Sequence, residues 1–356
     1  MFNKNLFANK LKNLEPYKVD TNNYFARLDA NESFIGASQE MLNCFTSILR
    51  RTDFNRYPDP DATRLCEAFA DFYGIESANV AAGNGSDEII SILMNSFADK
   101  NDSVMTFTPD FSMYNFYAQL AELECVSLPK TKDSLQIDFD AADYLVKQKN
   151  VKICIFSNPC NPTGRIEKKS DIVKLASDNP ETLFVIDEAY MDFAGECSLT
   201  ESFLKDVTDY PNIIVLKTLS KALGSAALRV GFVVADKVFC DMFKAVKSPY
   251  NLNTVSQNFA EAILKNKDML NSCIQKIVSS RDQLFEKIVS LGIAKPEKMY
   301  TNFIFFETPK AGEIYESLKK DGILIRKFPI AGGSLRITAG SEQENKLLIS
   351  ALAKLK

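Results

Sequence analysis

The sequence predicts an α/β fold, with a mostly parallel sheet in a large domain and a smaller α+β domain after it. From about residue 62 to residue 234, short apolar strands alternate with helical segments. Such alternation is typical of a parallel sheet with helices on both faces. After Pro249 a long amphipathic helical stretch, residues 254–291, leads into short strands. We therefore expect an N-terminal arm over 1–30, a large domain over 31–250 and a small domain over 251–356.

The expected strands are apolar runs bounded by polar or turn-forming residues. In the large domain they cover residues 80–82, 103–107, 124–127, 152–156, 183–186, 213–216 and 229–234. In the small domain they cover residues 303–306, 324–326 and 334–338. Helices are expected over residues 62–73 and 89–97, on either side of the first strand.

Composition excludes several classes of protein. The formal net charge of the 356-residue chain is only −4, with both signs mixed along it, which argues against a nucleic-acid or anionic-membrane partner. The apolar runs are too short to span a membrane, and residues 1–12 lack a signal-peptide core, so we expect a cytoplasmic protein. The eight cysteines form no Cys-x-x-Cys pair and are expected to be reduced thiols. The absence of histidine excludes Ser-His-Asp catalysis and most zinc sites, so no metal is expected.

Two reactive residues follow predicted strands, and a third lies shortly after them. Asp187 follows the strand over 183–186, and Lys221 follows the strand over 213–216, with Arg229 eight residues later. Open α/β sheets build their sites at the carboxyl ends of strands. A lysine that forms a Schiff base, an acid for a pyridinium nitrogen and a cation for a phosphate are what pyridoxal phosphate chemistry needs. Taken singly, Lys221 and Arg229 are ordinary surface cations and Asp187 is an ordinary helix N-cap.

Two loops and two tyrosines add to this pattern. The turn over residues 83–87, Gly-Asn-Gly-Ser-Asp, lies where a helix begins and could bind phosphate, or could simply be capped by its Ser or Asp. The loop over residues 158–164, Asn-Pro-Cys-Asn-Pro-Thr-Gly, could aim an amide at a ring hydroxyl, or Asn161 could cap the backbone. Tyr190 comes one helical turn after Asp187 and would reach the same site, whereas Tyr57 lies in a Tyr-Pro-Asp turn.

With these motifs in this order, the chain resembles fold-type I pyridoxal-phosphate aminotransferases, which have an aspartate-aminotransferase-like fold, over nearly its whole length. Within that superfamily it is most similar to the histidinol-phosphate aminotransferases. The features of that subgroup are Pro-Tyr at 16–17, Leu-Asp-Ala-Asn-Glu at 28–32, Arg-Tyr-Pro-Asp at 56–59, Pro-Tyr-Asn at 249–251 and Leu-Arg-Ile-Thr-Ala-Gly at 335–340.

The resemblance implies a role for each matching residue. Lys221 would bind the cofactor covalently and then shuttle a proton, with Asp187 paired to the pyridinium nitrogen and Tyr190 beside the ring. Asn161 and Tyr190 would bind the ring 3-oxygen, and Tyr114 would stack on the ring face. The residues around the phosphate would be Ser86, Asp87, Thr218, Ser220 and Arg229. Tyr57 would reach the phosphate bound by a neighbouring subunit. The substrate would meet Arg326 and Arg336 at its anionic end, with Tyr17 and Asn31 alongside.

These roles imply a homodimer with shared active sites and a two-substrate cycle. Histidinol phosphate would donate an amino group, and 2-oxoglutarate would accept it to give L-glutamate, a step of histidine biosynthesis. A threonine-phosphate-type decarboxylase and an aromatic amino acid aminotransferase use the same scaffold and remain alternatives. A DNA-binding regulator with an aminotransferase-like domain is a third alternative, but it would need an added basic domain that the first 30 residues do not supply.

Overall fold

The computed structural model describes residues 6–11, 20–294, 296–330 and 332–355. Its largest sheet has seven strands in the order β2-β8-β7-β6-β5-β3-β4. Their bounds are β2 (Val80–Gly83), β3 (Ser103–Thr108), β4 (Glu124–Pro129), β5 (Val151–Ser157), β6 (Leu183–Asp187), β7 (Ile213–Thr218) and β8 (Gly231–Val234). Strands β3 to β7 are parallel, and β8 runs antiparallel to both β2 and β7. The expected mostly parallel sheet is therefore confirmed.

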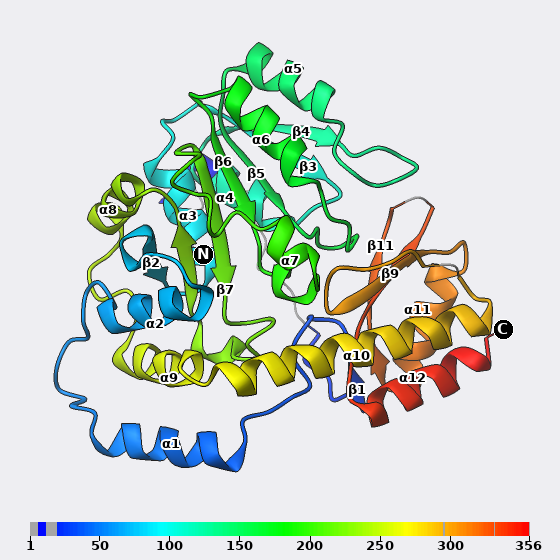
Figure 1. Cartoon of the computed structure of the whole chain (residues 1–356). Helices are drawn as coiled ribbons and strands as arrows, with labels where there is room; N and C mark the ends of the chain where they lie inside the picture. Colours follow the sequence, from blue (N-terminus) through cyan, green and yellow to red (C-terminus); the bar gives the residue numbers. More distant parts are fainter. Residues whose placement is uncertain (1–5, 12–19, 295, 331, 356) are drawn as a thin grey trace.

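Both faces of this sheet are buried. Along β6, Phe184 and Ile186 belong to one apolar cluster, whereas Val185 belongs to the cluster on the opposite face. This alternation within an uninterrupted apolar strand is typical of a sheet covered by helices on both faces. The covering helices are α2 (Thr63–Tyr73), α3 (Ser86–Ser96), α4 (Met113–Leu120), α5 (Phe139–Lys149), α6 (Lys169–Asp178) and α8 (Lys237–Val246) (Figure 1). The short helix α7 (Cys197–Thr200) has no buried residue and packs against the 3₁₀ helix Met191–Phe193.

A second, antiparallel sheet lies beside the first. Its order is β11-β12-β9, with β9 (Phe303–Glu307), β11 (Arg326–Phe328) and β12 (Ser334–Thr338). Helices α11 (Ala311–Lys320) and α12 (Glu342–Ala353) pack with it on the right of Figure 1. The single strand expected over 324–326 is wrong, because Ile325 separates β11 from β10 (Ile323–Leu324). Strand β10 pairs instead with β1 (Ala26–Arg27), which joins the end of the N-terminal arm to this part of the chain.

The helical stretch expected over 254–291 is two helices, α9 (Thr254–Leu264) and α10 (Lys267–Leu291). Asn266 separates them, since its side chain accepts a hydrogen bond from the Met269 amide and so caps α10. Helix α9 packs against α2 and α1 (Gln39–Arg50), and Phe45 stacks on Phe259 at 4.0 Å. Leu264 belongs to the core of the large sheet, so this core extends beyond residue 250. The domain boundary at 250 stays a prediction.

Among the helices of the described residues, none is both long enough and apolar enough to cross a membrane.

Candidate active site

The candidate site lies beyond the carboxyl ends of β5, β6 and β7. Register pairs Ser157, the last residue of β5, with Asp187, the last residue of β6. Strand β7 ends beside them at Thr218, three residues before Lys221. Because parallel strands bring their carboxyl ends to one edge of the sheet, side chains separated by more than 60 positions meet there.

Asp187 is a buried carboxylate whose hydrogen-bond donors in the described chain are both neutral. Its Oδ1 accepts from the Ala189 amide at 3.1 Å, and its Oδ2 accepts from the Tyr114 hydroxyl at 2.8 Å. Burial raises the pKa of Asp187 to about 6, although both hydrogen bonds oppose the shift. A cationic N–H next to this carboxylate would favour its charged form. The position therefore fits the pyridinium nitrogen of pyridoxal phosphate.

Tyr114 is buried on the inner side of Asp187, so its ring has no face open to a bound cofactor. Its side chain has no exposed surface, so it cannot stack on a bound ring without rearrangement, contrary to the expected role. Phe111 is half-buried and packs edge-on against Tyr114, with ring centroids 5.4 Å apart. Our sequence reasoning missed Phe111 as the aromatic ring with accessible surface. Its position directly after the Thr-Pro-Asp turn that ends β3 was the available signal.

Hydrogen-bond donors gather where α3 begins; we call this group, the first amides of α3 with Thr218, Ser220 and Arg229, the phosphate cup. The helix N-cap is Gly85, with φ +83° and no side-chain cap, so the alternative of capping by Ser86 or Asp87 is wrong. A Cβ at Gly85 would lie 2.7 Å from Nη2 of Arg229. Only glycine therefore allows the guanidinium this close to the helix start.

The polar residues expected around a phosphate meet at this cup. Arg229 donates to Ser220 Oγ and to Asp87 Oδ2, both at 3.4 Å, and the Thr218 hydroxyl donates to Ser220 Oγ at 3.0 Å. The amides of the first turn of α3, which begins at Ser86, have no side-chain cap. A helix N-terminus with a guanidinium and two hydroxyls fits a phosphate group.

Lys221, Tyr190 and Asn31 lie together at the front of the site. The half-buried Lys221 amine donates to the Ala30 carbonyl at 2.9 Å and lies 6.0 Å from the Tyr190 ring centroid. Asn31 donates from Nδ2 to the Tyr190 hydroxyl at 2.8 Å, and its Oδ1 accepts from Thr338 at 3.1 Å. The end of the arm and the segment after β6 thus meet beside the Lys221 amine.

Arg336 and Arg326 form the other wall. They lie directly opposite each other on β11 and β12, so their side chains project from the same face of this sheet. Arg336 is buried, donates to the Asp29 carbonyl at 2.5 Å and to Oδ1 of Asn161, and lies over the Phe303 ring. The pair therefore fits a carboxylate or phosphate. The Asn161 side-chain oxygen points to Arg336, which places this amide between the substrate wall and the cofactor position.

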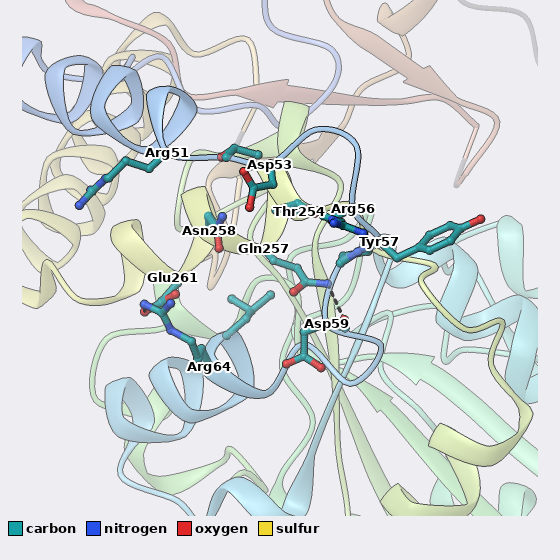
Figure 2. Close-up of a pocket in the computed structure, with 13 residues that line it drawn as sticks. Arg51, Asp53, Arg56, Tyr57, Asp59, Arg64, Thr254, Gln257, Asn258 and Glu261 are labelled. Atoms are coloured by element: carbon teal, nitrogen blue, oxygen red, sulfur yellow. Dashed lines mark hydrogen bonds and ion pairs between the residues drawn. The ribbon is translucent and has the colours of Figure 1, made fainter.

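Two predicted residues do not join this group. Tyr17 lies outside the described residues. Tyr57 is 81 % exposed and stacks on Tyr250, with ring centroids 4.6 Å apart. It lies at the edge of a 310 Å³ pocket and its ring points away from that pocket (Figure 2). Of the predicted residues that the structure describes, Tyr57 alone lines this pocket, so the pocket is not the candidate site.

Comparison with known proteins supports the same assignment. The family model for aminotransferase class I and II matches residues 19–352. The histidinol-phosphate aminotransferase of Clostridium novyi is 40% identical over 349 residues, which cover 98% of this chain and 96% of the relative. That of Clostridium kluyveri is 34% identical, with 98% of both chains covered.

A solved structure extends the comparison to three dimensions. The crystal structure of histidinol-phosphate aminotransferase from Sinorhizobium meliloti, in complex with pyridoxal-5'-phosphate, superposes with a TM-score of 0.88 and 25% identity, and the match covers 100% of this chain and 98% of that one. The expected fold and enzyme class are confirmed: this chain belongs to the class I and II aminotransferases and is a pyridoxal-phosphate-dependent enzyme.

Proposed function

We propose that this chain transfers the amino group of histidinol phosphate to 2-oxoglutarate, which yields imidazole-acetol phosphate and L-glutamate in histidine biosynthesis. Relatives of that name at 34–40% identity over nearly the full length support the substrate. In the structure, the observation that carries the proposal is the Arg336 guanidinium, which contacts Asn161 and the Asp29 carbonyl, with Arg326 directly opposite it on β11. Guanidinium groups bind phosphate and carboxylate alike, so one wall can serve both substrates in turn.

The cofactor, when bound, supplies the carbonyl carbon that takes up the amino group and a ring that accepts electrons. The chain would hold its phosphate with the α3 amides, Thr218, Ser220 and Arg229. Asp187 would hold the ring nitrogen protonated. Phe111 is our candidate for the ring face, in place of Tyr114.

Lys221 would hold the cofactor covalently and, once released, move the proton. A half-buried amine, with no histidine anywhere in the chain, is the base available to take a proton from the carbon that bears the substrate amino group. Tyr190 and Asn161 would orient the ring 3-oxygen. Asn31 would fix the Tyr190 hydroxyl through their 2.8 Å hydrogen bond.

We further propose a homodimer in which Tyr57 completes the partner's site. Its ring is 81 % exposed, and within one chain its ring contact is with Tyr250. An exposed aromatic pair of this kind is suited to contact a second copy. The cytoplasmic location stays a prediction.

The test of the function is a single turnover followed by absorption. The cofactor-loaded enzyme is mixed with histidinol phosphate alone, and the bound cofactor should change from its pyridoxal form to its pyridoxamine form. Addition of 2-oxoglutarate should reverse the change. Conversion by an aromatic amino acid but not by histidinol phosphate would replace the substrate, and release of carbon dioxide from a phospho-amino acid would indicate a decarboxylase.

A further inference from the structure

A fully buried ion pair lies next to the site. Lys130 directly follows β4, Asp110 comes two residues after β3, and Ser157 ends the neighbouring strand β5. The Lys130 amine lies 3.3 Å from Oδ2 of Asp110, and the side chains are 0% and 1% exposed. Removing two charges from water costs about as much as their attraction returns, so such a pair is weak evidence for stability alone. Its contacts are the better guide to its purpose.

The Asp110 carboxylate is the centre of a hydrogen-bond network. Its Oδ1 accepts from the Phe111 amide at 2.8 Å and from both the amide and the hydroxyl of Ser157. The Ser157 hydroxyl oxygen in turn accepts a hydrogen bond from the backbone N–H of Asn161 at 3.0 Å, and the side-chain oxygen of Asn161 accepts one from Arg336. The Asp110 carboxylate thereby connects the backbone at Phe111 with the loop that carries Asn161.

The charges suit this arrangement. Burial disfavours the Lys130 ammonium, but Cys160 and Asp110 beside it raise the pKa of Lys130 above its usual range. Lys130 also donates to the Cys160 sulfur at 3.0 Å, directly before Asn161 in the same loop. Only an ionised carboxylate accepts from all these donors at once, because an amide in its place would present an NH₂ group to one of them.

We propose that Asp110, paired with Lys130, is a positioning residue for amino transfer, which holds Asn161 against Arg336 on one side and the segment from Phe111 to Tyr114 behind Asp187 on the other. The proposal rests on the proposed function for its substrate readout, but not for its cofactor readout. The network connects the ends of β4, β3 and β5, so loss of the Asp110 carboxylate would shift both the segment that begins at Phe111 and the loop that carries Asn161 in the candidate site.

The experiment uses two variants and a matched control. Ser157→Ala removes the link to Asn161 and leaves the ion pair in place. The double variant Asp110→Asn/Lys130→Met removes both charges, so no unpaired buried charge is left to prevent folding. Ser202→Ala is the control, because the Ser202 hydroxyl also donates to a buried carboxylate, Glu188, at 2.7 Å, whereas its hydrogen bonds among the described residues reach none of the candidate site residues.

Three measurements are made on each full-length protein: a titration of the cofactor-free form that gives the dissociation constant of pyridoxal phosphate, the absorption of the bound cofactor against pH, and the steady-state kinetics with histidinol phosphate. We expect Ser157→Ala and the double variant to weaken cofactor binding and to lower kcat/KM about 10- to 100-fold, since small misplacements of reacting groups cost that much. The pH dependence of the cofactor absorption should shift as well. Ser202→Ala should match the wild type in all three.

Wild-type values for both variants would overturn the proposal. An equal loss in Ser202→Ala would also overturn it, because the effect would then follow from the loss of any buried hydroxyl. If the wild-type enzyme does not turn over histidinol phosphate, the proposed function fails. Cofactor affinity and absorption still test the positioning role in that case, since neither needs a substrate.

Discussion

The hydroxyl of Tyr114 donates a 2.8 Å hydrogen bond to Oδ2 of Asp187. The acceptor is the carboxylate expected to meet the pyridinium nitrogen, and burial has already raised its pKa to about 6. Tyr114 therefore favours the charged form of this acid from behind.

The first prediction concerns Tyr114→Phe. Loss of a hydrogen bond to the charged form raises the pKa of Asp187 further, so the acidic limb of the kcat/KM profile should move to higher pH. Because hydrogen bonds to charged groups contribute about 1.5–3 kcal/mol, kcat/KM should fall about 10- to 100-fold. The control is Tyr73→Phe, which loses a matched 2.9 Å bond to Asp192. It should lose stability and keep its pH profile; an unchanged profile in Tyr114→Phe would refute the role.

The second prediction concerns the stability of the cofactor-free protein. Burial raises the Asp187 pKa from 3.8 to about 6, so the folded chain holds this proton more tightly than the unfolded chain does. The corresponding stabilisation is present below about pH 4 and is lost as the pH rises through about 6. Asp187→Asn should therefore stabilise the cofactor-free protein above pH 6 by about 1–3 kcal/mol while abolishing turnover. Urea unfolding at pH 4 and pH 8 measures the difference, and equal stability of the two proteins at pH 8 would contradict it.

The third prediction concerns Lys221→Ala. Removal of the amine leaves no group to hold the cofactor covalently or to move the proton, so turnover should fall by at least about 10³-fold, while the phosphate cup still binds some cofactor non-covalently. Stopped-flow absorption after addition of histidinol phosphate measures the loss. Lys237→Ala, an exposed lysine on α8, is the control and should behave as wild type. Undiminished turnover in Lys221→Ala would remove the central assignment.

The fourth prediction concerns Arg336→Lys. The charge remains, but the planar fork that reaches both Asn161 and the Asp29 carbonyl is lost. KM should rise about 10- to 100-fold for both histidinol phosphate and 2-oxoglutarate, as the loss of a charged hydrogen bond predicts, with a smaller effect on kcat. Steady-state kinetics with each substrate tests this. A rise for only one substrate would show that the two anions bind at different places.

Much of the fold was predictable because the pattern is local. Each strand of the large sheet is a short apolar run between helical segments, and every one expected there is present. The features that the sequence did not specify, or specified wrongly, depend on tertiary contacts. Strand β8 runs antiparallel, Ile325 interrupts an expected strand, and β1 exists only because β10, some 300 residues later, pairs with it.

The candidate site divides in the same way. The sequence alone indicated the family, through the resemblance of its motifs, and it predicted Lys221, Asp187 and Arg229 as cofactor residues, because pyridoxal phosphate chemistry needs an amine, a carboxylate and a cation. Only the tertiary structure buried Tyr114 against Asp187, left Phe111 half-buried and buried Lys130 against Asp110. A side chain's partners depend on which strands become neighbours. That order is set by packing across the whole sheet, to which residues far apart in the chain contribute.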